Sequence, residues 1–139
     1  MAWLQENGAL VLMGMVFLFL MLRGPLLAHY YRIGSMSVHE LSQRLAASPS
    51  PLLIDVRTPA EYAGGHVREA RSYPLGSLGS KVEEVKKAAR DKEVVVICRT
   101  GNRSLMGSVT LKRHGMQKVY NVPGGMMHWE GQGYPVKRG

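Results

Sequence analysis

The chain has 139 residues, which is enough for one compact domain and a short additional segment. Its net charge of +8 raises the question of nucleic-acid binding, but the basic residues are scattered and aromatic residues make up only 7%. Few side chains are therefore present to stack on bases, and we predict no nucleic-acid partner. The basic surface is better suited to anionic lipid headgroups or anionic substrates.

The N-terminal segment is apolar, with no polar side chain between Ala9 and Leu22. Counted from Leu4, a helix here would be about 28 Å long at 1.5 Å per residue, close to the thickness of the hydrocarbon core of a bilayer. Arg23 and Arg32 follow the segment, whereas no Lys or Arg precedes it. The positive-inside rule therefore predicts a single-pass helix in the inner (cytoplasmic) membrane, with the rest of the chain facing the cytoplasm.

A cleaved signal peptide is the competing interpretation of this segment, and it would export the rest of the chain. Such a peptide has a positively charged start and small residues at a cleavage site. The chain begins without a basic residue and offers only residues 26–28, Leu-Leu-Ala, as a cleavage site. We therefore predict a transmembrane anchor over residues 1–23. Gly24 and Pro25 should end or bend its helix, and residues 24–34 should form a linker.

After the linker, helix and strand signals alternate. Ser37 and Thr58 each stand three residues before a glutamate, which is typical of a capping box at a helix start. Helices are expected over residues 37–47, just after Thr58, and over 78–90 and 104–114, with strands over 52–56, 94–97 and 118–122. Apolar strands that alternate with helices belong to a parallel sheet covered on both faces. The sequence thus predicts one α/β domain over residues 35–139.

Cys98 is the only cysteine, and it directly follows the apolar strand 94–97. A polar loop with one glycine and two arginines, Arg99 and Arg103, comes next, and then a helix. The backbone N–H groups of such a loop, the helix N-terminus and the guanidinium groups all favour an anion, so we expect Cys98 to react as a thiolate. A buried structural cysteine is the alternative, but a core thiol needs no arginines around it. In a parallel sheet this loop lies at the edge where catalytic loops gather.

Five groups of residues resemble, in order and spacing, the motifs of a single-domain rhodanese. They are Leu53–Arg57, Glu61-Tyr62 with Gly65-His66-Val67, Cys98–Arg103, Pro123-Gly124-Gly125 with Trp129, and Gly133-Tyr134-Pro135. The resemblance covers residues 35–136 and implies a rhodanese-like three-layer α/β fold with a central parallel sheet. It also implies a thiosulfate sulfurtransferase-like enzyme. Related cysteine phosphatases and arsenate reductases have five residues between the Cys and the Arg, whereas four lie between Cys98 and Arg103 here, which argues against both activities.

The resemblance implies that Cys98 carries sulfane sulfur as a persulfide, a covalent intermediate that divides one transfer into two steps. The expected donor is a small anion such as thiosulfate, bound by the loop residues Arg99, Thr100, Gly101, Asn102 and Arg103. The two arginines would hold its oxyanion end. Because the chain has no second cysteine to take up the sulfur, we expect an external acceptor: a thiol, a protein or cyanide.

Several neighbouring residues are expected to support the site. Asp55 and Arg57 should form an ion pair that fixes strand to helix, and Ser104 should cap the helix after the loop. Structural roles are expected for His66 as a loop tie, Trp129 as a core side chain, and Gly124 and Gly125 as a tight turn. The histidines show no metal-ligand spacing with one another or with Cys98, so we predict neither a metal nor another cofactor.

A second class of function is a membrane-tethered scaffold that recruits partners and turns over little substrate. The intact loop from Cys98 to Arg103 favours the enzyme, because an unused nucleophile site need not keep both arginines. The two hypotheses differ in whether Cys98 is needed for partner binding.

Overall fold

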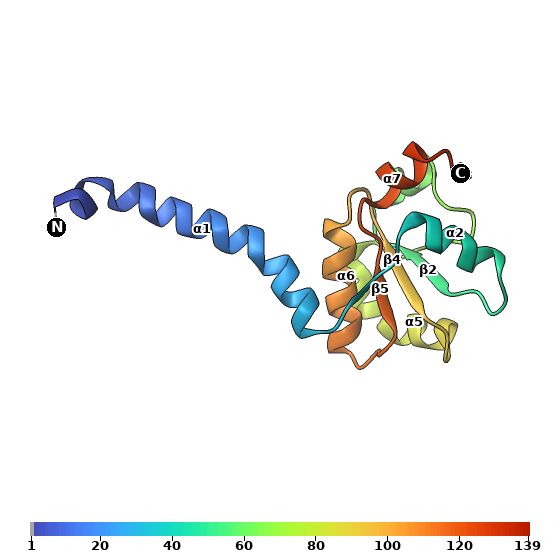
Figure 1. Ribbon diagram of the computed structural model, residues 1–139. Helices are drawn as coiled ribbons and strands as arrows, with labels where there is room; N and C mark the ends of the chain where they lie inside the picture. The colour runs from blue at the N-terminus through green and yellow to red at the C-terminus, as the bar shows by residue number, and fades with distance from the viewer. Residues whose placement is uncertain (1) are drawn as a thin grey trace.

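The computed structural model describes residues 2–139, which form a long N-terminal helix and an α/β domain (Figure 1). Met1, the first residue of the predicted anchor, lies outside the described residues. The helices are α1 (Ala2–Tyr30), α2 (Val38–Ala46), α3 (Pro59–Ala63), α4 (Leu75–Leu78), the 3-10 turn η1 (Gly79–Lys81), α5 (Val82–Ala89), α6 (Asn102–Arg113) and α7 (Gly125–Gly131). The strands are β1 (Gly34–Ser35), β2 (Leu52–Asp55), β3 (Arg71–Ser72), β4 (Val94–Ile97) and β5 (Val119–Asn121).

The five strands form one parallel sheet in the order β1-β5-β4-β2-β3. The predicted α/β fold with a central parallel sheet is therefore confirmed. Strand β4 is central, with β2 and β5 on either side. Register places Asp55 opposite Ile97 and Val96 opposite Asn121, so the three strands end at the same edge. The residues that follow them in the sequence are consequently brought together there.

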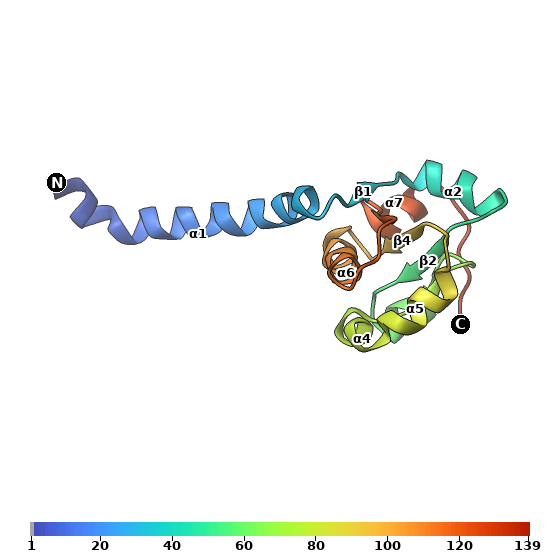
Figure 2. The same ribbon diagram turned by 90° about the horizontal axis from the view of Figure 1, so that it is seen from below.

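Helices cover both faces of the sheet. Alternate side chains of β2 and β4 point to opposite faces, as expected of strands. Leu53, Val95 and Ile97 pack with residues of α2 and α7, whereas Ile54, Val94 and Val96 pack with residues of α4, α5 and α6. Figure 2 shows α4 and α5 on the opposite side of the sheet from α2 and α7. Burial on both faces explains why these strands are apolar runs and not alternating patterns.

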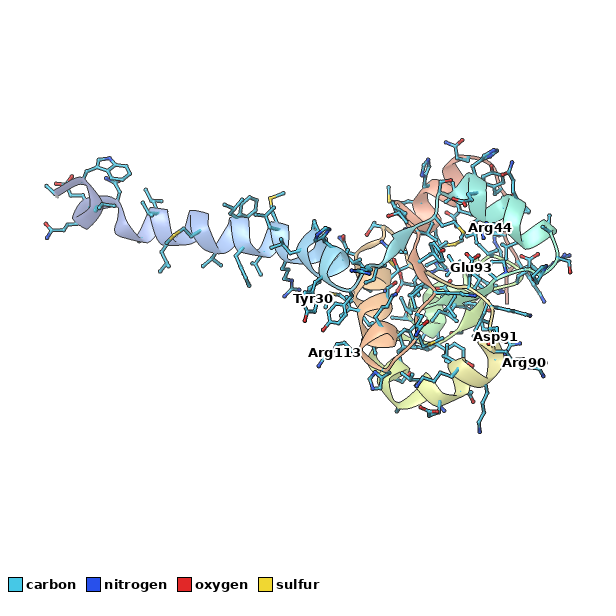
Figure 3. The ribbon with its side chains drawn as sticks, turned by 60° about the horizontal axis from the view of Figure 1, so that its bottom comes forward. Tyr30, Arg44, Arg90, Asp91, Glu93 and Arg113 are labelled. Carbon is cyan, nitrogen blue, oxygen red and sulfur yellow. The ribbon has the colours of Figure 1, made fainter. Side chains whose placement is uncertain are left out.

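The capping signals fix two helix starts in different ways. At α3 the box is complete: Thr58 Oγ1 accepts from the Glu61 N–H, and the Glu61 side chain accepts from the Thr58 N–H. At α2 only half of it forms, because Ser37 accepts from the Glu40 N–H while the Glu40 carboxylate pairs with Arg44. Arg44 also bonds to Glu93 at 2.6 Å, which ties α2 to the start of β4 (Figure 3).

Two parts of the domain differ from the prediction. The strands β1 and β3 contain only two residues each, too few to produce a recognisable apolar pattern. The helix expected over residues 78–90 begins earlier, at Leu75, and is divided into α4, η1 and α5. Gly76 and Gly79 lie in this region, and glycine is a weak helix former, which accounts for the division.

Helix α1 continues through Pro25 to Tyr30, so residues 24–30 of the predicted linker over 24–34 are helical. A proline inside a helix removes one backbone hydrogen bond and crowds the carbonyl four residues earlier, yet here the helix continues on both sides of Pro25. Only residues 31–33 connect it to β1. The side chains of α1 stand clear of the domain over most of its length (Figure 3), and none of them is buried. By length and composition, the helix is able to cross a membrane.

Candidate active site

The site lies at the C-terminal edge of the sheet, around the residue that follows the central strand. Cys98 stands there between Asp55 at the end of β2 and Asn121 at the end of β5. Its side chain is fully buried. The predicted position of Cys98 among the strand ends is therefore confirmed, and the thiol lies beneath the loop that follows it.

The first turn of α7 holds this loop from one side. Three carbonyl groups of the loop accept backbone hydrogen bonds, from Met126 to Cys98 at 2.8 Å, Met127 to Arg99 at 3.0 Å and Gly124 to Thr100 at 3.2 Å. In a trans peptide the C=O and the next N–H point in opposite directions, so the N–H groups of residues 99–101 point away from α7. The Gly101 N–H meets the Cys98 Sγ at 3.1 Å. The loop thus directs the Gly101 N–H at the thiol, as a donor of an anion-binding nest would be directed.

Ser104 contacts the thiol and does not cap the helix, so the predicted capping role is wrong. The cap residue is Gly101, which adopts a left-handed conformation at φ 105°. Ser104 lies in the first turn of α6 and is buried. The Cys98 thiol donates to its Oγ at 3.3 Å, and the hydroxyl donates in turn to Asn121 Oδ1. The cap position cannot supply a side-chain oxygen, because the sharp turn of the loop requires a glycine there.

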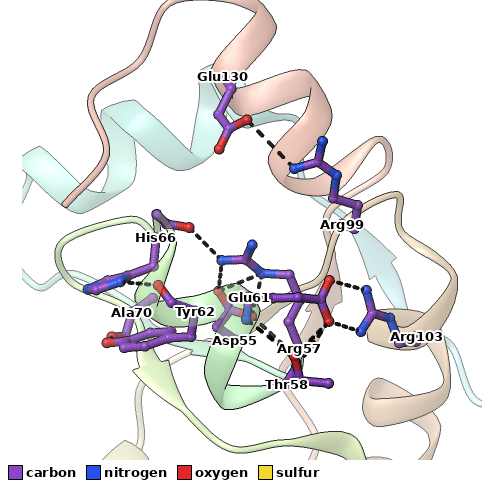
Figure 4. Close-up of polar contacts among 11 residues, drawn as sticks. Asp55, Arg57, Thr58, Glu61, Tyr62, His66, Ala70, Arg99, Arg103 and Glu130 are labelled. Carbon is purple, nitrogen blue, oxygen red and sulfur yellow. Dashed lines mark hydrogen bonds and ion pairs between the residues drawn. The ribbon is translucent and has the colours of Figure 1, made fainter. Parts of the chain in front are cut away.

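Arg103 is held by a carboxylate from another helix (Figure 4). Its two terminal nitrogens donate to the Glu61 carboxylate at 2.6 and 2.9 Å, a two-point ion pair. The Glu61 carboxylate raises the pKa of Arg103. The hydrogen bonds from Arg103, followed by the smaller contribution of Thr58, lower the pKa of Glu61 from its ordinary value of 4.5 to about 2. Arg103, which we predict to hold the oxyanion end of a donor, is therefore already paired with a carboxylate in the folded site.

Replacing Glu61 with glutamine should weaken the dependence of the free energy of unfolding on pH in acid. Because the pKa of Glu61 is depressed on folding, its ion pair contributes fully above pH 4.5 and is lost as pH falls toward 2. For a pair that is about one-third exposed, we expect Glu61→Gln to lower the free energy of unfolding at pH 7 by about 1 kcal/mol. Urea titrations from pH 2 to 7 should show the two proteins converging near pH 2. Parallel curves over that range would contradict this role.

Arg99 faces a second carboxylate on the other side of the site. Its Nη1 lies 3.8 Å from Glu130 Oε2, and both side chains are about half exposed (Figure 4). A cavity of about 300 Å³ lies beside this pair, and Arg57 and Glu61 are among its lining residues. Each loop arginine thus lies near a carboxylate. The cavity is polar, because charged side chains line it.

Asp55 and Arg57 form the expected ion pair, and it is buried. Arg57 Nη2 lies 2.8 Å from Asp55 Oδ2, and the Arg57 Nε and backbone N–H also donate to Asp55. A further bond of 2.8 Å runs from Arg57 to the carbonyl of Gly65. The pair therefore joins the end of β2 to the loop after α3, beside the polar cavity.

His66 and Trp129 occupy structural positions, as predicted. The buried His66 donates from Nδ1 to the Tyr62 carbonyl at 2.7 Å and stacks on the Tyr62 ring at 3.6 Å. Trp129 is buried in the core and donates to the Pro135 carbonyl at 2.9 Å. Both side chains tie loops to the domain.

Sequence reasoning missed the contributions of four residues to the site. Glu61 carries a capping signal, but its pairing with Arg103, 42 residues away, has no counterpart in the spacing. Glu130 and Asn121 show no motif that separates them from ordinary surface or strand residues. Gly125 was interpreted as part of a turn, although a Cβ there would lie 2.2 Å from the Cys98 carbonyl oxygen. Only the fold brings these residues to the loop.

Comparison with known proteins agrees with this geometry. The family model of the rhodanese-like domain matches residues 37–132. The chain is 36% identical over 104 residues to a sulfurtransferase of Allochromatium vinosum, covering 75% of this chain and 94% of that protein. It is 31% identical over 100 residues to a tRNA uridine(34) hydroxylase of Pectobacterium carotovorum, covering 67% of this chain but 28% of that longer protein. The crystal structure of a rhodanese-related protein from Thermoplasma volcanium superposes with a TM-score of 0.63 at 31% identity, covering 75% and 97% of the two chains. The chain therefore belongs to the rhodanese-like domain family, as its motifs indicated.

Proposed function

We propose that this protein is a sulfurtransferase that carries sulfane sulfur as a persulfide on Cys98. The observation that carries the proposal is the backbone N–H of Gly101 at 3.1 Å from the Cys98 Sγ, at the end of a loop whose first three carbonyl groups accept hydrogen bonds from residues 124–127. Such donors stabilise negative charge that develops beside them, as on a thiolate. The sulfurtransferase relative, which this chain covers almost completely, supports the same reaction.

The first half-reaction uses the groups around the thiol. The Cys98 thiolate attacks the outer sulfur of thiosulfate, a new S–S bond forms, and the old S–S bond breaks to release sulfite. Before reaction the thiol donates to Ser104. Once the proton has left, the Ser104 hydroxyl can rotate and donate to Sγ. The loop from Arg99 to Arg103 binds the anionic donor, which competes with Glu61 and Glu130 for the two arginines.

The same proposal includes a membrane anchor. Helix α1 has the length and composition of a membrane span, and Arg23 and Arg32 follow its apolar part. These charges support a domain that faces the cytoplasm from the inner membrane. The reducing conditions there would keep a lone thiol available for loading.

Intact mass of the full chain, purified in mild detergent, tests the persulfide. After treatment with thiosulfate we expect a gain of one sulfur, about 32 Da, that reductant removes. Cys98→Ser is the matched control and should gain no mass. An unchanged mass in the folded wild-type protein, with a free thiol and with glutathione persulfide offered as a second donor, would reject the proposed reaction.

Neutralising Glu130 should improve binding of an anionic donor. Glu130→Gln releases Arg99, and the gain for a partly exposed pair corresponds to a KM for thiosulfate about two- to fivefold lower, with kcat little changed. Steady-state transfer from thiosulfate to cyanide measures both constants. Glu69→Gln, which disrupts the exposed pair with Arg68, is the control and should leave KM unaltered. An unchanged KM in Glu130→Gln would show that the donor does not use Arg99.

The scaffold hypothesis has two observations in its favour. Cys98 is fully buried, and both loop arginines already have carboxylate partners. A binding module needs neither an open thiol nor free arginines. Partners captured equally by wild-type protein and by Cys98→Ser would support this function, whereas capture that requires loaded Cys98 would support the enzyme.

A further inference from the structure

The thiol of Cys98 lies at one end of a buried chain of hydrogen bonds whose other end is on β5. The Cys98 Sγ donates to Ser104 Oγ at 3.3 Å, and the Ser104 hydroxyl donates in turn to Asn121 Oδ1. Cys98 and Ser104 are fully buried, and Asn121 is 9% exposed. Strands β4 and β5 lie side by side with α6 against them, which brings the three residues together (Figure 1). The charge on the sulfur is therefore coupled to the direction of this chain.

In the observed direction the chain suits a neutral thiol. A hydroxyl has one proton, and that of Ser104 is directed at Asn121, so Ser104 presents lone pairs to Sγ. When Cys98 is a thiolate, Sγ becomes an acceptor and needs a donor in place of those lone pairs. The Ser104 hydroxyl supplies that donor only by turning away from Asn121 Oδ1. Two acceptor oxygens, Oγ and Oδ1, then face each other in a buried site, which is unfavourable.

The side chain of Asn121 removes this conflict, because an amide carries a donor and an acceptor on the same carbon. A half-turn about its terminal bond exchanges Oδ1 and Nδ2, and this torsion is broad and roughly two-fold in asparagine. Among residues 2–139, no hydrogen bond from Nδ2 has to be broken. The main chain stays in place, since β5 is paired on both sides and the Asn121 carbonyl accepts from Met36 at 2.9 Å. After the turn, Nδ2 donates to Ser104 and Ser104 donates to Sγ.

We propose that Asn121 is a positioning residue for sulfur transfer, whose amide accepts from Ser104 beside a thiol and donates to Ser104 beside a thiolate. The inference rests on the proposed sulfurtransferase function. Asn121 acts on Sγ through the Ser104 hydroxyl, which becomes a second donor to the sulfur after the Gly101 N–H. An aspartate at this position would only accept, and a leucine would do neither, so only an amide supports both directions.

The effect is largest when Cys98 is the leaving group. In unloading, cyanide attacks the outer sulfur of the anionic persulfide, and a bond forms between the cyanide carbon and that sulfur. The bond between Sγ and the outer sulfur breaks, and both of its electrons stay on Sγ. The products are thiocyanate and the Cys98 thiolate, so charge and electrons balance and no proton moves. The charge that appears on Sγ is the one that the reversed chain stabilises.

Single-turnover unloading of the full chain by cyanide, in mild detergent, tests the inference. Cys98 is first loaded and its persulfide verified by intact mass, so that donor binding by the loop arginines does not enter the rate. Asn121→Leu should unload at least about tenfold more slowly than wild type, the loss expected for a hydrogen bond to a developing charge. Asn121→Asp keeps the shape and the acceptor but not the donor, and it should be slowed as much or more.

A double-mutant cycle separates this role from packing. Ser104→Ala removes the hydroxyl, so the further change Asn121→Leu should slow unloading by less than about twofold in that background. Ser108→Ala is the matched control. It removes a buried hydrogen bond of 2.8 Å to the Ser104 carbonyl, one turn along α6, but no group of the chain to Sγ. This control should unload like wild type.

Two results would overturn the inference. One is equal slowing by Asn121→Leu with and without the Ser104 hydroxyl, which would mean that Asn121 acts by packing. The other is unloading of Asn121→Asp at the wild-type rate, because an acceptor alone would then suffice. Circular dichroism checks the fold of each variant, and Asn121→Asp takes the place of Asn121→Leu in the cycle if the latter unfolds. Wild-type protein that loads with neither thiosulfate nor glutathione persulfide would instead reject the sulfurtransferase function itself.

Discussion

Replacing Gly125 with alanine is expected to slow sulfur loading by at least about 100-fold, the cost of displacing reacting groups by roughly 1 Å. Gly125 has φ 49°, and a Cβ there would lie 2.2 Å from the Cys98 carbonyl oxygen and 2.8 Å from the Arg99 carbonyl carbon. Both are backbone atoms, so no side-chain rotation relieves the contact. The start of α7 must move away and release the hydrogen bonds from Met126 and Met127 to the loop.

The same change should lower the free energy of unfolding by about 2–6 kcal/mol, from backbone strain and two lost hydrogen bonds. Mass after thiosulfate treatment and urea unfolding measured by circular dichroism provide the two readings. Gly131→Ala is the control in the same helix, where a Cβ meets no atom within 4 Å. It should load normally and be equally stable or up to about 1 kcal/mol more stable. Normal loading of Gly125→Ala would show that α7 does not position the loop.

Removing the Arg57 side chain is expected to cost about 3–5 kcal/mol of stability. Arg57 is only 3% exposed and its partner Asp55 is fully buried, so Arg57→Ala leaves a buried carboxylate without its cation. The bond from Arg57 to the Gly65 carbonyl is lost as well, and the loop after α3 is released beside the polar cavity. Urea unfolding of the full chain at pH 7 measures the loss.

The double variant Asp55→Asn with Arg57→Met separates charge from packing. It removes both charges and keeps most of the buried volume, so we expect it to be more stable than Arg57→Ala. If Arg57→Ala unfolds in water, the double variant still permits the comparison. A cost of less than about 1 kcal/mol for Arg57→Ala would mean that solvent reaches this pair and that it behaves as a surface ion pair.

Local chemistry was sufficient for the sequence to predict much of this protein. The capping box at Thr58 acts over four residues, and the apolar runs of β2 and β4 reflect burial on both faces. Cys98 was placed at the strand end because strand, loop and helix follow one another directly in the chain. Each of these features depends on neighbours in sequence, so the fold class and the position of Cys98 at the strand end could be predicted from the sequence.

The surroundings of Cys98 were decided by tertiary structure alone. Arg103 pairs with a carboxylate on α3, and Arg99 lies near one on α7, and neither pairing is indicated by the loop sequence. Ser104 turns to the thiol because Gly101 takes the cap position and β5 brings Asn121 behind the hydroxyl.

Helix α1 illustrates the same limit on a larger scale. The sequence by itself determined an apolar helix long enough to cross a bilayer, because hydropathy and length are local properties. Its continuation through Pro25, and the packing of Gly24 against Leu105 of α6, appear only in the folded structure. Contacts between distant segments depend on which groups the folded sheet brings together, and a pattern of neighbouring residues does not predict them.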